Sequence, residues 1–305
     1  MAAASGVPTL IGTIHLPPLL GAPRTGGDSA AALLSETGLA AVREAQILER
    51  SGFHAVILEN FGDAPFYKGS VPPETIASMA VIAAAVRDSV GIAVGINVLR
   101  NDSRGALALA AVTGCEFIRV NVLSGVAATD QGLVEGAAAE LLRERRRLGQ
   151  EVAILADVHV KHARSLSGRE GVEGIAQAVE DAAKRALADG VIVTGTATGR
   201  PADADVLEAA GIAARRAGLP CYAGSGTTPD RLAEILKMVD GVIVGSALRR
   251  SGTAGAPLDP ARVASYAGAF RRAALRGSKR KGGGGRRGET LKVGSRPARR
   301  AAKRR

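Results

Sequence analysis

Ionisable and polar side chains stand at every second position in two apolar segments of this 305-residue chain. Asp157, His159 and Lys161 alternate in ADVHVK, and Arg119 and Asn121 alternate in FIRVNV. Alternate residues of a β-strand face the same side, so each set shares one face. Burying such groups is costly unless they are paired or used. A carboxylate, an imidazole and a cation on one face are the groups that proton transfer needs, with Asp157 and His159 as acid and base.

Other apolar segments also end in polar residues, which would converge if the segments were parallel strands with their carboxyl ends together. We predict a site at this end of the strands. The predicted catalytic residues are Asp157, His159, Glu59 and Lys161. The predicted substrate-binding residues are His15, Asn97, Arg119, Asn121 and Thr194. The alternative is an ion-pair network that only holds the mouth of the fold together.

Two glycine–serine turns, in AGSGTTPD and VGSAL, follow the last two apolar segments. Glycine lets backbone N–H groups approach an anion closely, and a helix expected from Pro229 would add its dipole. In barrels of alternating strands and helices this corner commonly holds a phosphate. The predicted phosphate-binding residues are Gly224, Ser225, Gly226, Gly245 and Ser246. Glycines that serve only tight turns are the alternative.

Eight apolar segments of strand length alternate with eight helical patterns, most of which end next to a glycine. The predicted strands are 10–15, 55–60, 92–99, 117–122, 152–160, 191–195, 220–225 and 242–246. The predicted helices are 38–51, 73–89, 103–113, 131–148, 174–189, 202–217, 229–240 and 259–275.

This alternation predicts an α/β fold with parallel strands, and eight strands close a (β/α)8 TIM barrel. A doubly wound open sheet is the second choice, but it would usually carry a glycine-rich turn after the first strand, where this chain has IHLPPLLGAP. Two connections, 16–35 and 61–72, are unusually long. The second contains Phe61, Phe66 and Tyr67, which suggests a lid over a ligand pocket or a packing loop.

The excess of positive charge is confined to the end of the chain. The net charge is +11, yet residues 276–305 hold 13 basic residues and one acid. We therefore divide the chain into a barrel domain, 1–275, and a disordered Gly/Lys/Arg-rich tail, 276–305. Such a tail could bind nucleic acid or another anionic surface, or could serve only solubility.

The remaining composition excludes several classes of protein. Cys115 and Cys221 form no CxxC pair, which favours small buried hydrophobes over a disulfide or zinc site. The histidines lack HxH or HExxH spacing, so we predict no required metal, and no motif predicts a nucleotide cofactor. No apolar run is long enough to span a bilayer and no secretory signal precedes the first strand, so we expect a cytoplasmic protein.

Long segments of the chain resemble the BtpA family. They include IGTIHLPPLLGAPR, ILENFGDAPF, GINVLRNDSRGALALA, ILADVHVKH and GSGTTPD, and they cover about residues 9–248 in the family's order. The resemblance implies a barrel of the ribulose-phosphate-binding type. It also implies a link to photosystem I biogenesis in photosynthetic members and to sugar metabolism in others. The resemblance carries over no catalytic residue.

Two functions follow as hypotheses. The first is an enzyme that acts on a small phosphorylated sugar or nucleoside-like metabolite by lyase-, isomerase- or hydrolase-like acid–base chemistry. The second is a non-catalytic factor for the biogenesis or stability of a membrane complex such as photosystem I. The expected partners are the phosphorylated metabolite, an anionic surface for the tail, and a second copy of the chain.

We expect removal of residues 276–305 to leave the melting temperature unchanged, because a disordered tail makes few folded contacts. If the tail binds DNA, that binding should weaken steeply between low and physiological salt, as expected for contacts with phosphates. Differential scanning fluorimetry and DNA binding at both salt concentrations test this. A melting temperature that falls by several degrees would mean that the tail packs on the barrel.

Overall fold

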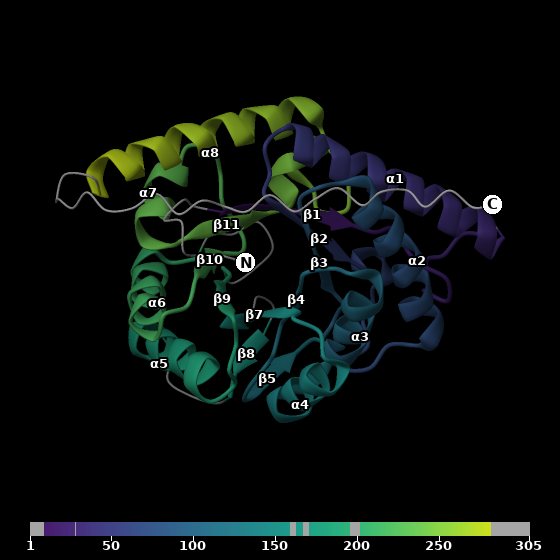
Figure 1. The fold of residues 1–305 in the computed structure, drawn as a ribbon, viewed down its shortest axis with the longest axis horizontal. Helices are drawn as coiled ribbons and strands as arrows, with labels where there is room; N and C mark the ends of the chain where they lie inside the picture. Colours follow the sequence, from purple (N-terminus) through teal and green to yellow (C-terminus); the bar gives the residue numbers. More distant parts are fainter. Residues whose placement is uncertain (1–8, 28, 159–162, 167–170, 196–201, 282–305) are drawn as a thin grey trace, which may run out of the picture.

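The computed structural model describes residues 9–27, 29–158, 163–166, 171–195 and 202–281. Eight parallel strands close into a barrel in the order β1-β11-β10-β9-β7-β4-β3-β2. Helices surround this barrel as an outer ring (Figure 1). The predicted (β/α)8 barrel is confirmed, and the open doubly wound sheet is excluded because β1 pairs with both β2 and β11.

The barrel strands coincide with the predicted apolar segments, although most end one or two residues earlier. They are β1 (Thr9–His15), β2 (Ala55–Glu59), β3 (Ala93–Asn97), β4 (Phe117–Val120), β7 (Ala153–Val158), β9 (Gly190–Val193), β10 (Cys221–Ala223) and β11 (Gly241–Val244). The strands are buried almost throughout, since helices cover one face and the barrel interior covers the other. Strand pairing includes polar residues of the mouth, since His15 pairs with Glu59 and Glu59 pairs with Asn97.

The helices of the ring are α1 (Ala30–Arg50), α2 (Pro73–Ser89), α3 (Ser103–Thr113), α4 (Ala138–Leu148), α5 (Gly171–Lys184), α6 (Ala204–Ala217), α7 (Leu232–Met238) and α8 (Pro260–Lys281). Helix α1 begins earlier than predicted because the hydroxyl of Ser29 caps it by accepting from the Ala32 N–H. Helix α8 continues to Lys281, so a truncation that spares it begins at residue 282. None of the described helices has the length and apolar composition needed to cross a membrane.

A small apolar layer fills the barrel beneath its mouth. Its buried members are Ile11, Ala55, Ile57, Phe117, Leu155, Ile192, Tyr222 and Ile243. The ring of Phe117 packs against Gly95. A Cβ at position 95 would lie 2.2 Å from this ring, so only glycine leaves enough room for it. The next inward-facing positions along the strands are those of the predicted site, since inward and outward residues alternate.

The prediction of a helix over 131–148 is wrong in its first part. Residues Val126–Thr129 (β5) and Gly132–Glu135 (β6) form a hairpin, to which Ala163–Ser165 (β8) adds a third antiparallel strand. Gly132 has φ +92°, a conformation that glycine adopts easily and that suits a tight hairpin turn. Val122, Ala127 and Val134 form a small apolar cluster under this sheet. The hairpin brings the chain between β4 and α4 toward the barrel mouth.

Both cysteines are free and buried, as the sequence predicted. Burial raises the pKa of the Cys115 thiol to about 11 and that of Cys221 to about 12. The thiols are therefore protonated at neutral pH and act as small apolar side chains.

Candidate active site

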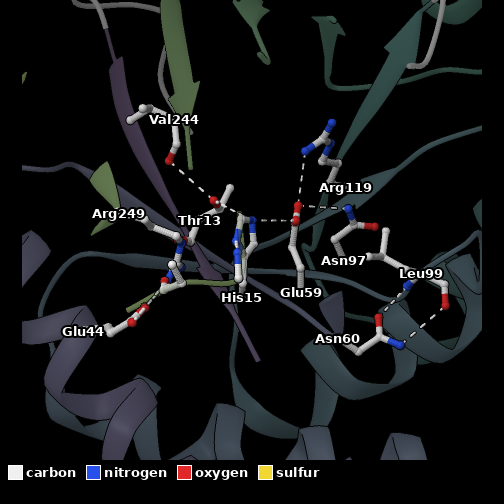
Figure 2. A network of polar contacts seen from close by, with 12 residues as sticks. Thr13, His15, Glu44, Glu59, Asn60, Asn97, Leu99, Arg119, Val244 and Arg249 are labelled. Carbon is white, nitrogen blue, oxygen red and sulfur yellow. Dashed lines mark hydrogen bonds and ion pairs between the residues drawn. The ribbon is translucent and has the colours of Figure 1, made fainter. Parts of the chain in front are cut away.

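Arg119 is the central cation of the barrel mouth. Its side chain is 3% exposed and lies between two carboxylates from other strands. Nε and Nη2 each donate to one oxygen of Asp157, at 3.0 Å. Nη1 donates to Glu59 Oε1 at 3.2 Å, as Figure 2 shows. Burial alone lowers the pKa of the Arg119 guanidinium, but the charges of Asp157 and Glu59 outweigh burial and raise it above its ordinary value.

Two asparagines complete this network. Asn97 Nδ2 donates to Glu59 Oε1 at 3.1 Å, and Asn121 Nδ2 donates to Asp157 Oδ2 at 2.7 Å. Asp157 thus accepts three hydrogen bonds, two of them from a guanidinium fork. These three bonds fix the position of the Asp157 carboxylate.

His15 occupies the other side of Glu59 (Figure 2). Its Nδ1 accepts a hydrogen bond from the Gly255 N–H at 3.0 Å, so in the neutral ring the proton resides on Nε2. Nε2 lies 3.2 Å from Thr13 Oγ1 and 3.7 Å from Glu59 Oε2. The ring stacks on Phe61 with a centroid separation of 4.4 Å. His15 is therefore fixed in position and tautomer beside Glu59.

Arg249, which was not among the predicted site residues, helps to position His15 through the backbone on either side of it. Arg249 is buried and donates to the carbonyl of Thr13 at 2.9 Å and to that of Ala256 at 2.7 Å. Two further bonds at 3.2 Å join it to Glu44 of α1. One side chain thus links β1 to the turn whose backbone N–H binds His15 Nδ1.

The five predicted phosphate-binding residues line one cavity of about 500 Å³ together with His15, Glu59 and Arg119. A Cβ on Gly245 would lie 2.4 Å from Thr13 Oγ1, so only glycine allows this close approach. Ser225 Oγ accepts from the Gly195 N–H at 2.8 Å. The prediction that a helix beginning at Pro229 adds its dipole to this corner is wrong. Helix α7 begins at Leu232 and has only seven residues.

A second cavity of about 600 Å³ continues the mouth on the other side of Glu59 and Arg119, which line both cavities. Asn97 and Asn121 line its polar part. Phe61 and Phe66 line it from the predicted lid loop, whereas Tyr67 is exposed. This loop is fixed through Asn60, whose Oδ1 accepts from the Leu99 N–H at 2.7 Å (Figure 2).

Two charged residues of the second cavity were not among the predicted site residues. Arg100 follows β3 and is buried, and burial lowers the pKa of its guanidinium despite the opposing charges of Asp130 and Asp157. Asp130 lines the cavity from the turn of the β5–β6 hairpin. The position of Arg100 after a strand was a detectable signal, whereas Asp130 enters the mouth only because of the unpredicted hairpin.

The structure thus brings together eleven of the fourteen predicted residues. Thr194 is buried beside Gly224 at the end of β9 and lines neither cavity. His159 and Lys161 lie outside the described residues. In the described part of the chain no three His, Cys, Asp or Glu side chains are grouped as metal ligands.

Comparison with known proteins identifies relatives for nearly the whole barrel. The profile of the BtpA family matches residues 7–272. The photosystem I biogenesis protein BtpA of Synechocystis sp. is 46% identical over 84% of this chain and 86% of its own length. An uncharacterized protein of Thermococcus kodakarensis is 47% identical over 80% of this chain and 87% of its own. An uncharacterized mitochondrial protein of Caenorhabditis elegans is 35% identical over 86% and 92%.

Solved structures match the fold at low sequence identity. N-(5'-phosphoribosyl)anthranilate isomerase of Pyrococcus furiosus has a TM-score of 0.51 at 13% identity, covering 87% of this chain and 98% of its own. The enzyme of the same name from Thermococcus kodakaraensis has a TM-score of 0.51 at 16% identity, with 87% and 99% covered. These likenesses establish the TIM-barrel fold and nothing about activity.

We expect Arg119→Met to lower the free energy of unfolding by about 3–5 kcal/mol, because it leaves two buried carboxylates without their shared cation. Urea unfolding measures this effect. Arg87→Met is the matched control, since Arg87 pairs with Glu116 on the half-exposed exterior at 2.9 Å. The control should lose no more than about 1 kcal/mol. Equal losses in the two variants would contradict a special role for Arg119.

Proposed function

The chain belongs to the BtpA family, and we propose that it is an enzyme that performs acid–base chemistry on a small phosphorylated sugar or related metabolite. The observation that best supports this is that one cavity is lined both by the glycine corner and by His15, Glu59 and Arg119. A phosphate in the corner would place the carbon chain of the ligand beside a carboxylate, an imidazole and a guanidinium.

The phosphate would be held mainly by backbone N–H groups of the two glycine–serine turns. Glycines leave the anion room to approach the backbone, and Ser246 adds a hydroxyl at the same corner. Arg262 of α8 lines the same cavity and adds a cation. The described carboxylate that lines this cavity is Glu59, so the corner itself is free of anionic side chains in the described chain.

Among the predicted catalytic residues, we assign proton abstraction to Glu59. Glu59 lines both of these cavities. Asp157 lines neither of them, although it lines a third cavity with Asn121, and it already accepts three hydrogen bonds. A general base must reach the proton it removes, which favours Glu59 on geometry. Asp157 then acts by fixing the guanidinium of Arg119. Roles for His159 and Lys161 remain predictions from the sequence.

Arg119 would stabilise the negative charge that proton abstraction creates. A guanidinium has five N–H groups, and the bonds to Asp157 and Glu59 use three of them. The other two can bind a substrate oxygen in the cavities that Arg119 lines. The carboxyl group of Glu59 would then return the abstracted proton to the product, while the Nε2–H of His15 beside it would donate a hydrogen bond to a substrate oxygen.

The second candidate, a non-catalytic factor for photosystem I, is favoured by the 46% identity to the Synechocystis protein. However, relatives of similar identity and coverage come from an archaeon, and another comes from an animal mitochondrion. Neither organism has photosystem I. A property shared by all of these proteins must therefore lie elsewhere, and a metabolic reaction satisfies that condition.

Binding of inorganic phosphate, measured by isothermal titration calorimetry, tests the corner. We expect Ser246→Asp to weaken binding about a hundred-fold, because a carboxylate would face the anion. Ser246→Asn has nearly the same size without the charge, and it should change the affinity by less than about tenfold. Ser246 is preferred over Gly245 because a side chain at 245 would also displace Thr13. If the wild-type chain binds no phosphate, the proposed substrate class is wrong.

Exchange of carbon-bound hydrogen tests the chemistry. We expect at least one aldose or ketose phosphate of three to six carbons to lose a C–H signal in D2O, followed by ¹H NMR. Glu59→Gln should abolish this exchange and leave phosphate binding unchanged, since glutamine keeps the shape but cannot accept the proton. Asp157→Asn serves as the comparison. If only Asp157→Asn stops exchange, the base is Asp157, and phosphate binding without any exchange would favour the non-catalytic factor.

A further inference from the structure

The amide oxygen of Asn121 is buried without a hydrogen-bond partner. Asn121 is 3% exposed, and no donor in the described part of the chain reaches its Oδ1. A buried acceptor left unpaired is costly, so such an atom usually has a partner that the protein alone does not supply.

The orientation of this amide is fixed by its neighbour. Nδ2 donates to Asp157 Oδ2 at 2.7 Å, and Asp157 is also held by two bonds from Arg119. A flipped amide would place Oδ1 against the carboxylate, where two acceptors repel each other. The unpartnered atom is therefore the oxygen, and what it lacks is a donor.

Asn121 lies across the barrel from the glycine corner. It follows β4, whereas the corner follows β10 and β11. Two strands separate them in one direction around the barrel and three in the other. Asn121 lines the second cavity with Arg100 and Asn97, and Glu59 and Arg119 line both cavities. A ligand with its phosphate in the corner would pass Glu59 and reach Asn121 with its other end.

We propose that Asn121 Oδ1 is a specificity subsite that accepts a hydrogen bond from a hydroxyl on the non-phosphate end of the substrate. This inference rests on the proposed function and narrows the substrate to a polyhydroxylated phosphate monoester. A hydroxyl can donate to Asn121 and also accept from a nearby guanidinium. An ammonium group has no lone pair with which to accept from a guanidinium, and a second phosphate dianion has no proton to donate.

A comparison of ligands in two variants tests the subsite. The probes are inorganic phosphate, pentyl phosphate, ribose 5-phosphate and ribulose 5-phosphate, with Kd measured by titration calorimetry. In the wild-type chain we expect at least one sugar phosphate to bind more than tenfold tighter than pentyl phosphate, which has the same chain length without hydroxyls. In Asn121→Ala this advantage should fall at least about tenfold, while phosphate and pentyl phosphate bind as before.

Asn101→Ala is the matched control. Asn101 also lies near the end of β4, but both of its amide atoms bond the backbone of Val122 at 2.9 Å. Its loss should leave the ratio of the two affinities unchanged. If Asn121→Ala does not fold, the affinities of the wild-type chain still decide whether the hydroxyls contribute to binding. Equal affinities for the sugar phosphates and pentyl phosphate would overturn the subsite.

The outcomes separate the two proposals. If phosphate and pentyl phosphate bind but neither sugar phosphate gains affinity, or if the gain survives in Asn121→Ala, the subsite is overturned and the phosphate corner stands. If no phosphate compound binds, the proposed function fails and the subsite fails with it.

Discussion

The mouth of this barrel depends on one buried guanidinium shared by two carboxylates. Arg119 of β4 joins Glu59 of β2 to Asp157 of β7, so a single side chain connects strands on either side of its own. Removing charged groups from water is costly, and only close pairing with further hydrogen bonds compensates that cost. Asn97 and Asn121 supply those bonds. If one member of this cluster moved away, the others would remain buried without a partner, which is costly. The cluster therefore fixes the positions of these side chains.

The charged cluster and the residues that stabilise the fold occupy different parts of the barrel. Below the cluster, Phe117 and the other members of the interior layer are apolar, and Gly95 makes room for the Phe117 ring. Beside it, Arg249 and Glu44 connect the β11 side of the mouth to β1 and α1 (Figure 2). The mouth residues are therefore held by their neighbours and are not themselves the main source of stability, which comes from the apolar layers.

The sequence predicted the barrel and the convergence of its site because both depend on local periodicity. His15, Glu59, Arg119 and Asp157 all stand at inward positions of strands that apolar patterning identifies. The contacts among them could not be predicted in the same way. Whether Asp157 is a base or an anchor depends on Arg119 reaching it, and no spacing encodes that distance. Strand β6 falls inside the predicted helix 131–148, because the sequence pattern does not separate its four residues from the helical pattern that follows them.

The charges of the mouth also constrain how an anion could enter it. Glu59, Asp157 and Arg119 together carry one net negative charge, so a phosphate dianion placed against Asp157 would be repelled. At the glycine corner the approach is lined by backbone, hydroxyls and Arg262, with Glu59 toward the centre. Under the proposed function, an anionic ligand would therefore lie with its phosphate at β10 and β11 and its neutral part toward β4. The reacting carbon would then lie beside Glu59, so the proposed substrate geometry rests on the placement of charge as well as on shape.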